Sequence, residues 1–178
     1  MATGGAWAVA TPTSVALALV DVLRRAGAAQ FGLDHARILA PLGAIPDARE
    51  RRRMVGDLAD DLLAPLGTVV TPGGLRHGRS LGALELHGAG GRHDHDLRAG
   101  SLELLPLPPG ATAVAEFRFN DTVRLGGRGR HFALDVTGGL GGLLVDLRDV
   151  PLHLPDRADL RGELLGAWQA AVRMGAEA

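Results

Sequence analysis

The chain has 178 residues, a formal net charge of −1, and no cysteine, tyrosine or lysine, so that all 19 of its basic residues are arginines. The missing cysteines exclude disulfides, thiolate nucleophiles and cysteine zinc sites, and the missing lysines exclude a Schiff-base or P-loop lysine. A near-neutral chain with 3% aromatic residues has little means of binding nucleic acid or an anionic membrane. No apolar run approaches the roughly 20 residues of a membrane span, and no secretory signal opens the chain, so we expect a cytoplasmic protein.

Residues 1–64 predict an α/β segment. Thr11 is typical of a helix start and Gly27 of the stop that follows it. The residues between them are apolar nearly all round, which predicts a helix covered on several sides. A short strand is expected at 30–33, and Asp47 then predicts the cap of a second helix. The apolar residues of that second helix recur at helical spacing: Met54, Val55, Leu58, Leu62 and Leu63.

Residues 65–155 predict a β-rich domain, a small sandwich or barrel, so that the fold class is α+β. Short β-prone runs alternate there with turns rich in glycine and proline. The expected strands are 67–71, 81–87, 101–105, 113–119, 131–136 and 143–146. Asp156 predicts the cap of a closing helix in 156–178, which packs on the β domain. The apolar face of that helix is Leu160, Leu164, Leu165, Trp168 and Val172.

His93 and His95, one residue apart, are the candidate metal ligands. On a strand their imidazoles would share one face and could approach one ion, but a metal site needs a third ligand. The sequence does not place the other histidines that could supply it: His77, His87 and His131. Glycines at 88–91 predict a hairpin tip, which favours the alternative interpretation of a solvated turn edge.

A glycine loop containing Gly138, Gly139 and Gly141 is the candidate ligand loop. Such a loop can hold an anion when it opens a helix. A strand is expected after it here, which favours a tight turn or bulge over a ligand site. The nearby Arg128 and Arg130 could bind phosphate, and solvation is the alternative.

The sequence shows few arrangements of residues that could catalyse a reaction. None of the three serines lies in a Gly-x-Ser-x-Gly elbow. Among the carboxylates, only Asp146 and Asp149 are marked out by apolar surroundings. We therefore expect no catalytic residue, and no catalysis, from this chain alone.

One family resemblance extends almost end to end. It is carried by residues 3–7, 15–25, 33–37, 42–43, 63–70, 100–110 and 138–155. Together these runs resemble the C-terminal part of the glutamate mutase-associated MutL-type family, also called GlmL, which is distinct from mismatch-repair MutL. That family is similar to the actin, sugar-kinase and Hsp70 ATPase superfamily. The resemblance implies that residues 1–64 are the end of an actin-like ATPase domain.

The resemblance also implies a cofactor site and a role. In that superfamily a Gly-Gly loop before a helix lies against adenosine, and Gly4 and Gly5 match its position. The acidic residues that hold magnesium and activate water would lie upstream, so the resemblance implies that the chain is a fragment, a split gene product or a truncated paralogue. No cofactor is then expected for this chain alone, and ATP would bind only with the N-terminal half.

Three functions remain open, and one of them is an enzyme that uses Asp34, Asp146 or Asp149. The implied one is a noncatalytic accessory or docking module, which binds an upstream ATPase-like half or a subunit of a B12-dependent mutase. The alternative is a small-molecule or metal-binding β domain with no ATPase role.

Overall fold

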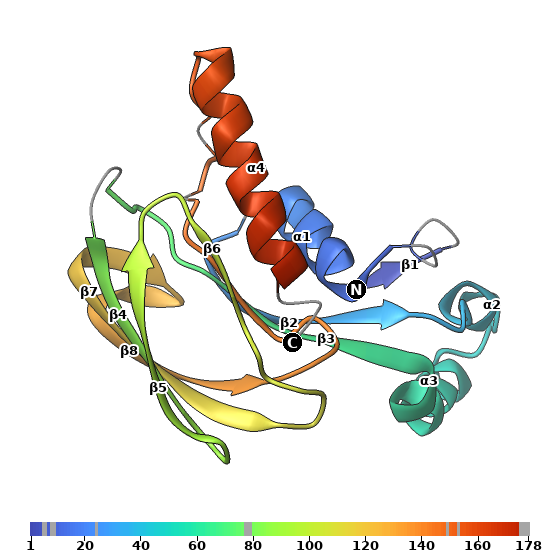
Figure 1. The fold of residues 1–178 in the computed structure, drawn as a ribbon. Helices are drawn as coiled ribbons and strands as arrows, with labels where there is room; N and C mark the ends of the chain where they lie inside the picture. Colours follow the sequence, from blue (N-terminus) through green and yellow to red (C-terminus); the bar gives the residue numbers. More distant parts are fainter. Residues whose placement is uncertain are drawn as a thin grey trace.

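The computed structural model of the chain describes residues 1–4, 7, 10–23, 25–76, 80–148, 150–152 and 154–174. These residues form nine strands and four helices (Figure 1). The strands are β1 (Ala2–Thr3), β2 (Gly27–Asp34), β3 (Leu63–Thr71), β4 (Ser80–Gly88), β5 (Gly91–Arg98), β6 (Leu102–Leu105), β7 (Thr112–Leu125), β8 (Gly127–Thr137) and β9 (Leu143–Asp146). The helices are α1 (Pro12–Leu23), α2 (Leu39–Gly43), α3 (Ala48–Leu62) and α4 (Ala158–Met174).

A five-stranded mixed sheet in the order β1-β2-β3-β9-β6 lies at the centre of three layers. Helices α1 and α4 pack on one of its faces, and the antiparallel sheet β5-β4-β7-β8 packs on the other (Figure 1). Strand alternation divides the core between them, since Val69 and Leu144 face the helices whereas Val70 and Val145 face the second sheet. The fold is thus α+β with two stacked sheets, and the described strands form no closed barrel.

The predicted domain boundary after residue 64 falls inside β3. This strand pairs with β2 on one side and with β9 on the other. The central sheet therefore combines strands from both predicted segments, while the division into domains stays a prediction.

Helix starts follow their capping residues. The Thr11 hydroxyl accepts the Ser14 N–H at 3.3 Å, just before α1. One Asp47 carboxylate oxygen accepts two amide N–H groups in the first turn of α3, at 2.7 and 3.1 Å. Contrary to the prediction, Leu63 does not belong to this helix. Its backbone pairs with Asp34, and it is the first residue of β3.

Both helices beside the central sheet are less covered than their sequences predict. On α1, Val22 is 80% and Leu23 48% exposed, although the helix is apolar nearly all round. Helix α4 begins two residues after Asp156, and its Leu160 and Leu165 are also exposed. The part of α4 that packs on the sheet is centred on Trp168 and Val172. None of the described helices combines the length and the hydropathy needed to cross a membrane.

Candidate functional site

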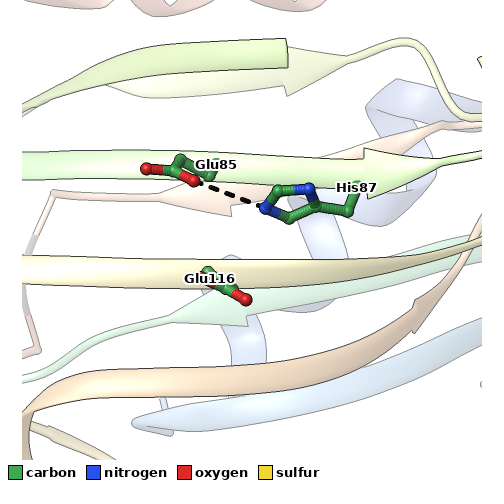
Figure 2. Close-up of side chains that lie close together, drawn as sticks. All are labelled: Glu85, His87 and Glu116. Carbon is green, nitrogen blue, oxygen red and sulfur yellow. Dashed lines mark ion pairs between the residues drawn. The ribbon is translucent and has the colours of Figure 1, made fainter. Parts of the chain in front are cut away.

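Three side chains of types that can ligate a metal lie close together on the outer face of the four-stranded sheet (Figure 2). Glu85 and His87 alternate along β4 with Leu84 and Leu86, whose side chains fill the core on the inner face. Glu116 lies directly opposite Glu85 on β7. One ligand atom from each of the three residues lies within 4.8 Å of the other two.

Glu85 is the most buried member, at 6% exposure, and its two oxygens have different neighbours. Oε1 lies 2.8 Å from Arg118 Nη1 and 3.1 Å from Arg92 Nη2. Oε2 lies 3.4 Å from His87 Nε2, an atom that is itself buried and has no hydrogen-bond partner among the described residues. A hydrogen bond to Asp94 raises the pKa of Arg92, so the guanidinium beside Glu85 stays charged.

His93 and His95 lie on β5 and share one face of it, as expected. Their cross-strand neighbours are Leu86 and Leu84, so this face is the inner one, opposite to Glu85. The predicted hairpin tip at 88–91 is also present between β4 and β5. Within the described part of the chain, no third metal-ligating group joins these two histidines. Of the histidines left open as a third ligand, His87 instead belongs to the group with the two glutamates, His131 lies on β8, and His77 is outside the described residues.

The glycine loop at residues 138–142 is held by its own amide groups. All five donate to main-chain carbonyls, at 2.8 to 3.1 Å. A Cβ at Gly139 would lie 2.2 Å from Gly67 N, and one at Gly138 2.2 Å from Leu107 O. The loop thus packs closely against the central sheet, and an anion at Gly138, Gly139 or Gly141 would compete with these hydrogen bonds.

Gly4 follows β1 with φ +110° and has open space where a Cβ would point. Gly5 lies outside the described residues, as does Asp149. The strand before this position is β1, Ala2–Thr3.

Asp146 forms a buried ion pair that joins the sheet to both helices. Arg148 donates to its two oxygens at 2.8 Å each, and to Asp21 of α1 at 2.8 Å. The same guanidinium lies over the Trp168 ring of α4, 4.9 Å from its centroid. Burial opposes the charge of Arg148, but the hydrogen bonds outweigh it and raise its pKa. This arrangement is a structural tie rather than a place for a substrate.

The second candidate surface is the edge of β2, which the sequence does not single out. Among the described residues, 27–32 pair only with β3, because β1 covers no more than Leu33 and Asp34. A groove of about 440 Å³ lies beside this edge, on the helix-covered face of the sheet. Its lining is mostly apolar: Val20, Leu23, Arg25, Ala26, Gly27, Ala28, Ala29, Phe31, Val69 and Thr71.

Comparison of the chain with protein-family models, curated proteins and solved structures gives no match.

Proposed function

We propose that this chain is a noncatalytic docking module that binds a partner protein by strand addition along β2. The observation that carries the proposal is the edge of β2 at residues 27–32, which no other strand covers among the described residues. An exposed strand edge presents N–H and C=O groups that an incoming strand can satisfy. The open stretch is six residues long by its numbering, which is the length of an ordinary strand.

The groove beside β2 supplies the side-chain contacts that such a strand needs. Alternate side chains of a strand point to opposite faces, so every second residue of the partner would enter the groove. Phe31 and Val69 form its floor on the sheet, and Leu23 borders it on α1. Val22, exposed next to Leu23, extends the apolar surface available to a partner. A partner strand with apolar residues at alternate positions therefore fits this site.

The family resemblance supplies the candidate partners, an ATPase-like half or a subunit of a B12-dependent mutase. In this proposal residues 1–64, which include β1, α1, β2 and the start of β3, are the remnant of an actin-like ATPase domain, and the complex acts in the cytoplasm. A partner strand placed in line with β1 would run parallel to β2, as β1 does. ATP would bind to the joined ATPase rather than to this chain alone.

The docking proposal is tested with Leu23→Asp, which places a charge at the border of the groove. Leu140→Asp is the matched control, because Leu140 is similarly exposed at 52% and does not line the groove. We expect calorimetry with the purified ATPase-like chain or mutase subunits to show binding that Leu23→Asp weakens about tenfold or more, or roughly 1.4 kcal/mol. Leu140→Asp should bind like the unmodified chain.

Two results would contradict this proposal. One is a complex with equal affinity for both variants. The other is a dimer of this chain that Leu23→Asp abolishes, since a second copy would then occupy the groove.

The noncatalytic part of the proposal has its own test. The purified chain should hydrolyse no ATP in a phosphate-release assay. ATP turnover that is lost on substitution of Gly4 or Gly5 would show that the chain is an ATPase by itself.

A further inference from the structure

We infer that Glu85, His87 and Glu116 form a binding site for a first-row divalent metal ion, with Zn²⁺ as the best match. This site lies on the outer face of the four-stranded sheet and is independent of docking along β2. An imidazole nitrogen with two carboxylate oxygens is a ligand set that suits zinc and its neighbours. Mg²⁺ and Ca²⁺ prefer oxygen ligands alone.

The spacing of the ligand atoms fits such an ion. Two ligands at about 2.1 Å from a tetrahedral zinc lie roughly 3.4 Å apart. His87 Nε2 and Glu85 Oε2 are separated by 3.4 Å, and the Glu116 carboxylate joins them within 4.8 Å. The three residues project from adjacent paired strands, and the Glu116 carboxylate would have to move closer to complete the set.

The missing hydrogen bond at His87 Nε2 points to a ligand. Its Nε2 is buried and has no hydrogen-bond partner in the described part of the chain. Leaving a buried polar atom without a partner is unfavourable, and coordination to a metal would offset that penalty. The side chain as a whole is 38% exposed, so the site lies at the surface of the sheet.

The two arginines beside the site form ion pairs with the carboxylate ligands. Arg118 and Arg92 both approach Oε1 of Glu85, which leaves Oε2 facing His87. Groups that hold a ligand in this way orient it and tune its basicity. Arg118 Nη2 also lies 3.6 Å from Glu116 Oε2, so it would have to share this carboxylate with the ion. The competing explanation is an ion-pair ladder across the strands that binds no metal.

The experiment is calorimetric titration of ZnCl₂ into the full chain, without a histidine tag, in a non-chelating buffer near pH 7.5. We expect one ion per chain. His87→Ala and Glu116→Gln should each weaken binding by more than about 100-fold, beyond the 10–100-fold typical of residues outside the ligand set. The double variant His93→Ala/His95→Ala is the matched control and should keep the affinity of the unmodified chain.

Three results would overturn the inference. The first is no binding of zinc by the unmodified chain, which favours the ion-pair ladder. The second is unchanged affinity in Glu116→Gln. Glu116 is partly exposed, so this variant should fold even if His87→Ala does not. The third is loss of binding in the His93/His95 variant alone, which would move the site to the inner face of β5.

Discussion

Asp34 is a single buried carboxylate that joins three elements. At the end of β2 it accepts the hydroxyl of Thr3 from β1 at 2.8 Å. It also accepts the amides of Ile38 and Leu39 at 3.0 and 3.1 Å, where α2 begins. Burial opposes its ionisation, but these hydrogen bonds outweigh burial and lower the pKa of Asp34. Asp34 therefore fixes the end of β1 beside the open edge of β2.

Asp34→Asn should cost about 1–2 kcal/mol of unfolding free energy at pH 7, because it replaces a charged acceptor by a weaker one. The folded-state pKa of Asp34 lies below its unfolded value of about 3.9, so the folded chain binds fewer protons. This stabilisation is complete above that unfolded value and is lost as pH falls through the folded-state pKa. Urea unfolding between pH 7 and pH 2 measures both effects.

The variant should accordingly lose less stability than the unmodified chain on acidification. Asp57→Asn is the control, since Asp57 forms an exposed pair with Arg53, and its cost should be within about 0.5 kcal/mol. Equal costs for the two variants would contradict the role given to Asp34.

At the scale of elements, the glycine loop after β8 allows the backbone there to pack closely against β3. Gly139→Ala should destabilise the protein by about 2 kcal/mol or more, because its Cβ would meet the backbone of Gly67 and Leu66 at 2.2 and 2.4 Å. Gly162→Ala is the matched control, since Gly162 lies inside α4 with no atom near its Cβ position. It should stabilise the protein by about 0.5–1 kcal/mol. Thermal or urea unfolding of the two variants compares them, and a tolerated Gly139→Ala would contradict the packing role.

The Asp146–Arg148 pair connects β9 with α1 and α4. Arg148→Met should cost about 3–5 kcal/mol, because it leaves Asp146 buried without its guanidinium partner. The double variant Asp146→Leu/Arg148→Met should regain about 1 kcal/mol or more, since no charge of the pair remains buried. Urea unfolding provides the comparison. A double variant less stable than Arg148→Met would show that the pair does more than tie the elements together.

At the scale of the whole molecule, the sequence predicts best what local residues determine. Thr11 and Asp47 mark helix starts by direct hydrogen bonds to the next turn. The alternation of inward and outward side chains at 113–119 predicts the first half of β7, because a half-buried strand requires it. The short helix α2 is not predicted, since its N-cap residue, Ile38, makes no side-chain cap. The amides at its start are accepted instead by Asp34, four or five residues earlier.

The candidate sites depend on contacts between distant residues, which is why the sequence predicts them poorly. Leu84-Glu85-Leu86-His87 already places Glu85 and His87 on one face of an expected strand. That Glu116 lies opposite Glu85 depends on the register between β4 and β7. The open edge of β2 likewise follows from the pairing order of the central sheet, because among the described residues β1 pairs only with residues 33–34 of β2. Local sequence patterns carry neither piece of information.

The most direct measurement of the central claim is hydrogen exchange of this chain with and without the ATPase-like chain or mutase subunits. We predict that amides within residues 27–32 of β2 become protected in the complex, because an added strand bonds to them. Residues 127–137 of β8, at the edge of the other sheet, should exchange as in the free chain. A complex that leaves β2 unprotected, or that protects β8 instead, would contradict docking by strand addition at β2.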